Sequence, residues 1–218
     1  MMFYNYLIIV LVSYLIGSFS TALVFNKLVN KIDPRETGSK NLGALNTLRI
    51  TSKQKGTFIG VLGFLLVFLI DAAKGALAVW LAMLLLPESP IIAATLAGFF
   101  VILGHNYSIL IKFDGGRGAA TFMGILLFID PTLKMFLIWL GSVIAFSLIF
   151  ELFIPVDKKR NFFKRAISDQ IIGRLFGEVF ALIPFFFLNP LLFWVALFST
   201  PLILIRHIDR VKEQIKND

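Results

Sequence analysis

The chain of 218 residues contains no cysteine, only two histidines and few charged residues. The absence of cysteine excludes disulfide bonds, thiolate metal ligands and a cysteine nucleophile. Imidazole chemistry is limited to His105 and His207. Charged residues make up 16% of the chain and hydrophobic residues 58%, whereas a soluble domain carries about 25% charged residues. This composition excludes a water-facing surface and predicts an integral membrane protein.

Several catalytic signatures are also missing. Neither histidine begins a His-x4-Asp pair, because Leu110 and Lys212 stand where the aspartate would be, so a general base of that type is absent. The chain contains no Gly-x-Ser-x-Gly and no His-Glu-x-x-His motif, and neither a serine hydrolase nor a zinc protease is indicated. The formal net charge of +8 is scattered between apolar runs. That pattern is typical of membrane topology rather than of nucleic-acid binding.

Apolar runs predict seven helices that cross the membrane. The first run is interpreted as a retained span, because it has neither the basic start nor the small-residue cleavage site of a signal peptide. Asp130-Pro131 and Asn189-Pro190 are turn signals that divide two longer apolar stretches. The chain is therefore predicted to be all-α, with one membrane domain over residues 1–218. The expected spans are residues 3–28, 57–86, 91–111, 120–129 and 133–154, followed by a hairpin of two helices within 171–205.

The distribution of lysine and arginine predicts the orientation of these spans. Positive charge collects in residues 31–55, 112–117, 158–174 and 206–216. With seven crossings these four segments share one side, and the opposite connections near Glu88, Asp130 and Asn189 carry almost no positive charge. The positive-inside rule then places the amino terminus outside and the carboxyl terminus in the cytoplasm. The protein is expected in the cell membrane, with its basic loops facing the cytoplasm.

Two glycine-rich segments within these basic connections carry groups that bind phosphate. In residues 38–49, two glycines permit tight turns, small polar side chains offer hydrogen bonds, and Arg49 adds a planar fork that matches phosphate oxygens. In residues 115–118, three glycines permit close backbone approach to an anion, and Thr121 is the expected N-cap of the next helix. This segment is not a nucleotide-binding Walker motif. Spacing alone leaves an ordinary polar loop and a flexible hairpin as alternatives to an anion site.

Ionisable residues also occur inside or at the end of the predicted spans. Asp71 and Lys74 are three residues apart and therefore share a helix face, where they can neutralise each other. We interpret them as a structural ion pair, with a functional intramembrane site as the alternative. His105 and His207 stand near the cytoplasmic ends of their spans, where a histidine is often part of the membrane interface.

The order of the motifs resembles that of the bacterial acyl-phosphate:glycerol-3-phosphate acyltransferases, a family of small seven-span enzymes of phospholipid synthesis. The resemblance runs over nearly the whole chain, and it is the joint order of the motifs that makes it specific. The matching pieces are Tyr14-Leu15-Ile16-Gly17-Ser18, Gly38-Ser39-x-Asn41-x-Gly43-Ala44-x-Asn46-x-x-Arg49, Asp71-x-x-Lys74-Gly75, Gly104-His105-Asn106, Gly115-Gly116-x-Gly118-x-Ala120-Thr121 and Arg206-His207.

The resemblance implies a reaction and a set of site residues. An acyl group would move from acyl phosphate to the 1-hydroxyl of glycerol 3-phosphate, giving lysophosphatidic acid without a metal or other cofactor. Ser39, Arg49 and His207 would be catalytic, with Asp71, Lys74 and His105 in structural or supporting roles. The oligomeric state is left open. The expected substrate-binding residues are Gly38, Asn41, Gly43, Asn46, Gly115, Gly116, Arg117, Gly118, Thr121 and Ser168.

This chain departs from the family pattern at several positions. Arg117 replaces a usual lysine, exchanging a compact ammonium for a larger planar fork. The motif Arg-x-x-Ser-x-x-Ser is matched at best by residues 165–171, with Asp169 adding a negative charge and Ile171 in place of the second serine. The alternative function is therefore a divergent, noncatalytic protein that binds phospholipid or phosphate, or transports a small anion. The remaining departures are Ser20 for proline, Lys40 for glycine, Leu45 for threonine and Arg210 for asparagine.

Overall fold

The computed structural model describes residues 2–154, 161–168 and 170–216. The described residues form helices without a β-strand, which confirms the all-α prediction. In chain order the elements are α1 (Met2–Ser18), α2 (Thr21–Phe25), η1 (Asn26–Asn30), α3 (Ala44–Lys55), α4 (Thr57–Leu85), α5 (Pro90–Asn106), η2 (Ile109–Ile111), α6 (Ala119–Ile129), α7 (Lys134–Phe153), α8 (Phe162–Ser168), α9 (Ile171–Phe180), α10 (Leu182–Leu188), α11 (Pro190–Ile205) and α12 (Ile208–Lys216).

The helices include both full-length and short apolar segments. Three apolar helices, α5, α6 and α11, are shorter than a full span and lie within the predicted runs 91–111, 120–129 and 171–205, apart from one residue at the start of α5 and of α6. Large apolar side chains such as Leu69 of α4 and Phe187 of α10 are exposed, as lipid-facing residues are. Among the described residues, the segments long and apolar enough to cross a membrane are Phe3–Asn30, Thr57–Leu85, Lys134–Phe153 and Ile171–Leu188.

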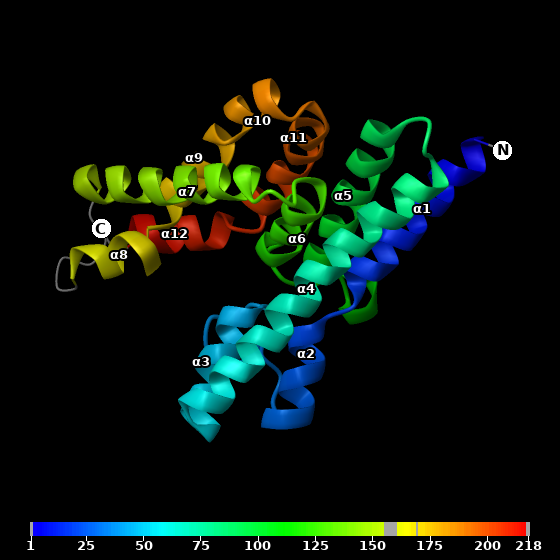
Figure 1. The fold of residues 1–218 in the computed structure, drawn as a ribbon. Helices are drawn as coiled ribbons and strands as arrows, with labels where there is room; N and C mark the ends of the chain where they lie inside the picture. Colours follow the sequence, from blue (N-terminus) through cyan, green and yellow to red (C-terminus); the bar gives the residue numbers. More distant parts are fainter. Residues whose placement is uncertain (1, 155–160, 169, 217–218) are drawn as a thin grey trace.

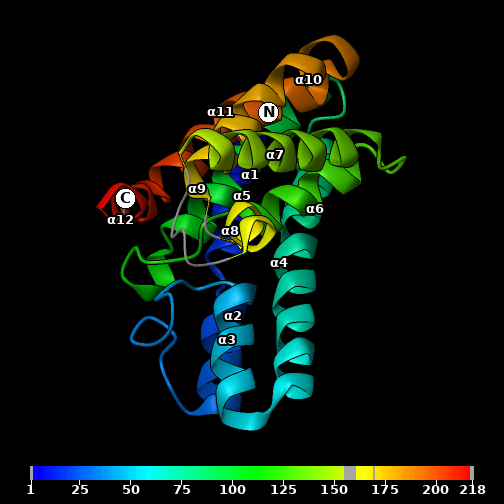
Figure 2. The ribbon, with the colours of Figure 1, turned by 90° about the vertical axis from the view of Figure 1, so that its left-hand side faces the viewer.

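The helices form a packed body with one extension. Helix α5 packs against α1, α4 and α11, and α6 packs against α4. Helices α2 and α3 lie beside the amino-terminal part of α4, and together they extend away from the body (Figures 1 and 2). Helices α7, α8 and α9 form the opposite side, near α12 (Figure 1). Because α4 runs through both the extension and the body, it supplies side chains to the space between them.

The predicted span over residues 3–28 coincides with the apolar segment Phe3–Asn30, within which the helix is interrupted. Helix α1 ends at Ser18, and Ser20 caps α2 by accepting a hydrogen bond from the Leu23 amide at 3.4 Å. The carbonyl oxygens freed by the break have other partners. Lys74 Nζ donates to Gly17 O at 3.2 Å, and Ser108 Oγ donates to Ser18 O at 2.6 Å. Side chains distant in sequence therefore stabilise the break, together with the local cap at Ser20.

Glycines permit three pairs of helices to approach closely. A Cβ on Gly104 of α5 would clash with the Tyr14 carbonyl oxygen of α1, and one on Gly124 of α6 would clash with the Ala72 carbonyl oxygen of α4. Gly173 and Gly177 of α9 similarly face the backbone of α7. Small residues at helix contacts are the usual means of association in a bilayer, where van der Waals packing replaces the hydrophobic effect.

The predicted turns lie at helix boundaries. Helix α6 ends before Asp130, whose carboxylate accepts a hydrogen bond from the Met135 amide at 2.7 Å. Asn189 caps α11 through its Oδ1, which accepts from the Leu192 amide at 3.0 Å, and Pro190 is the first residue of that helix. Both turn predictions are therefore confirmed. They rest on local capping chemistry that sequence displays directly.

Candidate active site

Asn46 shapes the loop that precedes α3. Its buried side chain accepts a hydrogen bond from the Ser39 amide at 2.8 Å and donates to the carbonyl oxygens of Pro34 at 2.9 Å and of Thr37 and Asn41 at 3.1 Å. The polar atoms of Asn46 are thus bonded to loop backbone. Asn46 therefore holds the loop around Ser39 in place, and its direct contact with substrate stays a prediction.

Arg49 belongs to a helix, which corrects the expectation that residues 38–49 form a loop throughout. It lies on α3, whose buried face carries Thr47 and Thr51. These hydroxyls accept hydrogen bonds from Asn26 Nδ2 at 2.9 Å and Asn30 Nδ2 at 2.8 Å, which fixes α3 against α2 and η1. Arg49 itself is exposed. A rigid support therefore presents its guanidinium to the outside of the fold.

Arg206 holds the second glycine-rich segment in place. Its Nε donates to Gly116 O at 3.1 Å, and its Nη2 donates to Gly115 O at 2.8 Å and to Asp114 Oδ1 at 2.9 Å. The guanidinium carbon lies 5.3 Å from the centroid of the Tyr107 ring, within cation–π range. One side chain at the end of α11 thereby fixes the carbonyl groups of a loop 90 residues earlier.

The amides of the first two glycines are occupied within the protein. Gly115 N donates to Asp114 Oδ1 at 2.8 Å, and Gly116 N donates to His105 O at 2.9 Å. Helix α6 begins at Ala119 with Gly118 as its N-cap, and Thr121 is a buried residue in the first turn. The expectation that Thr121 caps this helix is therefore wrong. The first amides of α6, which have no carbonyl partner within the helix, are the backbone donors suited to an anion here.

A cavity of about 210 Å³ lies between the loop before α3, helix α4 and the start of α6. Its lining divides chemically. Polar side chains come from Asn41, Asp71, His105 and Arg117, next to Gly118, Ala119 and Ala120 at the start of α6. The apolar lining includes Leu45, Phe64, Phe68 and Met123. The cavity therefore combines two groups that bind anions, Arg117 and the start of α6, with an apolar wall, beside the carboxylate of Asp71.

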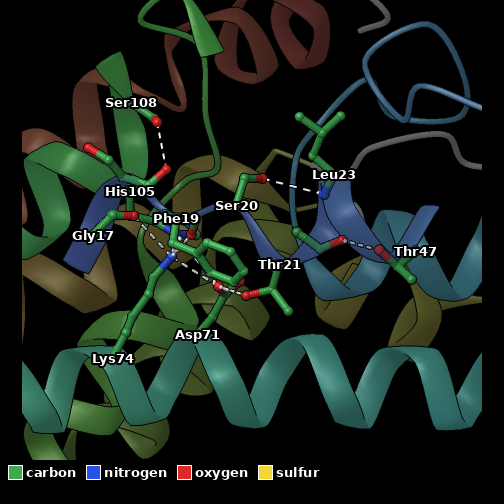
Figure 3. A network of polar contacts seen from close by, with 12 residues as sticks. Gly17, Phe19, Ser20, Thr21, Leu23, Thr47, Asp71, Lys74, His105 and Ser108 are labelled. Carbon is green, nitrogen blue, oxygen red and sulfur yellow. Dashed lines mark hydrogen bonds and ion pairs between the residues drawn. The ribbon is translucent and has the colours of Figure 1, made fainter. Parts of the chain in front are cut away.

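A buried polar network connects this cavity to the break after α1 (Figure 3). Lys74 Nζ lies 3.0 Å from Asp71 Oδ1 and 2.7 Å from His105 Nδ1, and it donates to Phe19 O at 3.1 Å. Thr21 Oγ1 donates to Asp71 Oδ1 at 3.1 Å. The network joins α1, α2, α4 and α5, so the predicted pair of Asp71 and Lys74 forms and has a structural role.

His207 is neutral at physiological pH. Its Nδ1 lies 2.8 Å from Ile203 O, so Nδ1 carries the proton and donates, and Nε2 keeps its lone pair. The pKa of His207 is lowered to about 4, chiefly by burial; the hydrogen bond to Ile203 O opposes this shift, and the positive charges of Arg117, Arg174 and Arg210 add to it. The imidazole is thus available as a hydrogen-bond acceptor within a cationic environment.

The structure brings part of the predicted site together. Asn41, Gly43, Arg117 and Gly118 line the cavity, as does His105. Ser39, Arg49 and His207 lie outside its lining, and the side chain of Ser168 and all of Asp169 lie outside the described residues. Within the part of the chain that the structure describes, no three His, Asp or Glu side chains form a group able to hold a metal ion.

Sequence reasoning missed two features of the site. The roles of Arg206 and Asp114 were not foreseen, although Arg206 belongs to the Arg206-His207 motif and Asp114 directly precedes the second glycine-rich segment. The apolar wall of Phe64 and Phe68 was also missed, because in α4 these residues look like any other membrane-facing phenylalanine. Their spacing of four residues, which places both on one helix face, was the available signal.

Comparison with known proteins assigns the chain to a family. The profile of the glycerol-3-phosphate acyltransferases matches residues 7–217. The glycerol-3-phosphate acyltransferase of Alkaliphilus metalliredigens is 39% identical over 140 residues, 64% of this chain and 66% of that protein. The enzyme of Burkholderia vietnamiensis is 34% identical over 201 residues, 92% of this chain and 83% of that protein. The alignments with the Alkaliphilus and Bordetella pertussis enzymes cover 66% and 60% of those proteins, in both cases less than two thirds of their length.

Solved structures show the same fold. The crystal structure of PlsY, an integral membrane glycerol 3-phosphate acyltransferase in its glycerol 3-phosphate form, matches with a TM-score of 0.68 and 27% identity, over 97% of this chain and 92% of that one. The lysophosphatidic acid form of PlsY matches with a TM-score of 0.66 and 26% identity, with the same coverage. The chain therefore belongs to the glycerol-3-phosphate acyltransferase family.

Proposed function

We propose that this protein transfers a fatty acyl group from acyl phosphate to the 1-hydroxyl of glycerol 3-phosphate, forming lysophosphatidic acid. The observation that carries the proposal is the divided cavity, in which Arg117 and the amino end of α6 stand beside Phe64 and Phe68. A phosphoryl group suits the first part and an acyl chain the second. The related PlsY structures, in glycerol 3-phosphate and lysophosphatidic acid forms, support the same substrate and product.

The chemistry requires positioning more than covalent catalysis. Acyl phosphate is a mixed anhydride, so attack by the glycerol hydroxyl forms the new ester bond while the bond between the acyl carbon and the phosphate oxygen breaks. The hydroxyl proton passes to the departing phosphate. Arginine side chains and helix amides stabilise the charge on that phosphate. Neutral His207, with a free lone pair on Nε2, is suited to accept a hydrogen bond from the attacking hydroxyl.

The proposed arrangement in the membrane has seven crossings, an external amino terminus and a cytoplasmic carboxyl terminus and active site. The asymmetry of lysine and arginine supports it. The absence of cysteine makes a direct test simple. A single cysteine in place of Lys55 should resist a membrane-impermeant maleimide in intact cells, and one in place of Glu88 should react. The reverse pattern would overturn the orientation.

The decisive assay for activity is transfer from palmitoyl phosphate to radiolabelled glycerol 3-phosphate by the purified protein in detergent, with Arg49→Ala as the control. Product from the unmodified protein alone would support both the reaction and the basic site. No product with any acyl chain or phosphorylated acceptor would favour the noncatalytic alternative. Within that alternative, anion transport along the pair of Asp71 and Lys74 is less favoured than phosphate binding. Four acceptor atoms of the protein already surround Lys74 Nζ within 3.2 Å.

A further inference from the structure

His105 occupies a position between the buried ion pair and the cavity. It is the penultimate residue of α5, is 8% exposed and contributes to the cavity lining. The preceding Gly104 is in close contact with the α1 backbone, so the end of α5 has little freedom to shift. The imidazole is therefore held in place, and its chemistry depends on which ring nitrogen carries the proton.

Lys74 determines that choice. An ammonium group has only donors, so the nitrogen 2.7 Å away, His105 Nδ1, must offer a lone pair. Asp71 Oδ1 lies 3.0 Å from Lys74 Nζ and, as its ion-pair partner, directs this group (Figure 3). The proton of the neutral imidazole then lies on Nε2. This tautomer is opposite to that of His207, whose Nδ1 donates to a carbonyl.

The Nε2 edge of His105 faces the glycine-rich segment. A Cβ on Gly116 would clash with this nitrogen, so a glycine is needed here to give the imidazole room. Arg117 and Gly118, the next residues, line the cavity together with His105. His105 therefore borders the same cavity as Arg117 and the start of α6, and an imidazole N–H, a guanidinium and a helix amino end are all groups that bind anions.

We propose that His105 is a substrate-binding residue whose Nε2–H donates a hydrogen bond to a phosphoryl oxygen of the acyl phosphate, in a tautomer set by the Asp71–Lys74 ion pair. The inference rests on the proposed function and deepens it by assigning a further contact to the acyl donor. The donor is favoured over glycerol 3-phosphate because Phe64 and Phe68, in the same cavity, suit an acyl chain. Lys74 acts as a positioning residue through His105.

Two substitutions of His105 separate binding from structural support. The amide of His105→Asn reaches the Nδ1 position and keeps a partner for Lys74, but it leaves the Nε2 position empty. The amide of His105→Gln reaches the Nε2 position and restores a donor toward the cavity. We expect His105→Asn to raise the KM for palmitoyl phosphate at least ~10-fold, as loss of a hydrogen bond to a charged group does. His105→Gln should stay within ~3-fold of the unmodified protein.

The order of the two variants tests the proposal directly. If His105 served only to satisfy Lys74, His105→Asn would be the better variant, and that result would overturn the proposal. The KM for glycerol 3-phosphate should change in neither variant, and a rise confined to this KM would overturn the assignment to the acyl donor. Thermal unfolding in detergent shows that both variants are folded before their kinetics are compared.

A binding measurement separates this proposal from the proposed function. The chain has only two histidines, so ¹⁵N NMR of the His207→Asn variant reports the His105 ring alone. We expect a protonated Nε2 and a bare Nδ1, and a shift of the Nε2 signal on addition of a hydrolysis-resistant acyl phosphonate. A protonated Nδ1, or an Nε2 chemical shift that does not change when the phosphonate is added, would overturn the proposal. If the unmodified protein transferred no acyl group but the signal still moved, the transferase function would fail and the hydrogen bond would stand.

Discussion

The guanidinium of Arg206 donates a hydrogen bond to the carbonyl oxygen of Gly116 at 3.1 Å, linking the end of α11 to the glycine-rich segment before α6. The same guanidinium also donates hydrogen bonds to the Gly115 carbonyl oxygen and the Asp114 carboxylate. With these acceptors engaged, the segment keeps the conformation in which Arg117 and the start of α6 border the cavity. The C-terminal motif thus supports the anion site as well as carrying His207.

Replacement of Arg206 should therefore weaken binding of the acyl donor. We expect Arg206→Ala to lower kcat/KM for palmitoyl phosphate about 10- to 100-fold, the range for lost hydrogen bonds to a charged group. Arg206→Lys should recover only part of this loss, because an ammonium cannot reproduce the planar fork. Steady-state kinetics with Lys134→Ala as an exposed-charge control measures the effect, and unchanged kinetics in Arg206→Ala would contradict the role.

Arg49 provides a test in which activity and folding separate. The family resemblance makes Arg49 a catalytic residue, so Arg49→Ala should abolish acyl transfer. Because its side chain is exposed on α3, the melting temperature in detergent should be unchanged. Lys53 is one helical turn further along, also exposed, and supplies a matched loss of positive charge. Lys53→Ala should retain activity. Equal turnover in the two variants would remove Arg49 from the site.

Two glycines test the packing of the helices. Gly124→Ala would place a methyl group against the Ala72 carbonyl oxygen, and we expect it to destabilise the protein by about 1–3 kcal/mol through overpacking of α4 and α6. Gly141 of α7 has no neighbouring atom within 4 Å of the place that a Cβ would take, so Gly141→Ala should be neutral or slightly stabilising. Melting temperatures in one detergent give the comparison, and equal values for the two variants would refute this contact.

His207 predicts a specific response to acid. Its pKa is depressed in the folded protein to about 4 from 6.5, so the unfolded chain binds a proton more readily. The resulting stability is fully present above pH 6.5 and is lost as the pH falls toward 4, by up to about 3 kcal/mol. Melting temperatures of the unmodified protein should therefore fall more steeply than those of His207→Asn over this interval. Parallel curves would show that His207 is not held neutral.

The sequence revealed helices and turns more readily than side-chain partners. Apolar runs and the Asp130-Pro131 and Asn189-Pro190 turns predicted many boundaries of the apolar helices, because spanning length and capping are local properties. The break after Ser18 escaped prediction, since it depends on Lys74 and Ser108 far along the chain. Local apolar patterns carry no information on such distant partners.

For the candidate site, too, the sequence predicted the chemical groups but not their contacts. The chemistry of the glycine-rich segments and of Arg117 indicates an anion site, and the structure places Arg117 at the cavity. Which amides of the second segment remain available could not be predicted, because Asp114 and His105 occupy those of Gly115 and Gly116. Asn46 has the chemistry of a ligand but is bonded to its own loop. A motif identifies the groups present, and the fold determines which of them are already in use.

Helix α4 has a further consequence for how the chain tolerates change. At 1.5 Å per residue its 29 residues extend roughly 43 Å, with Gly63 against the extension at one point and Gly75 against α6 at another. A single inserted residue between these glycines would rotate one contact relative to the other by about 100°. An insertion or deletion between Gly63 and Gly75 would therefore keep both contacts on the same face only if it added or removed whole helical turns. Homologous sequences should thus align through this stretch without gaps, even where their loops differ in length.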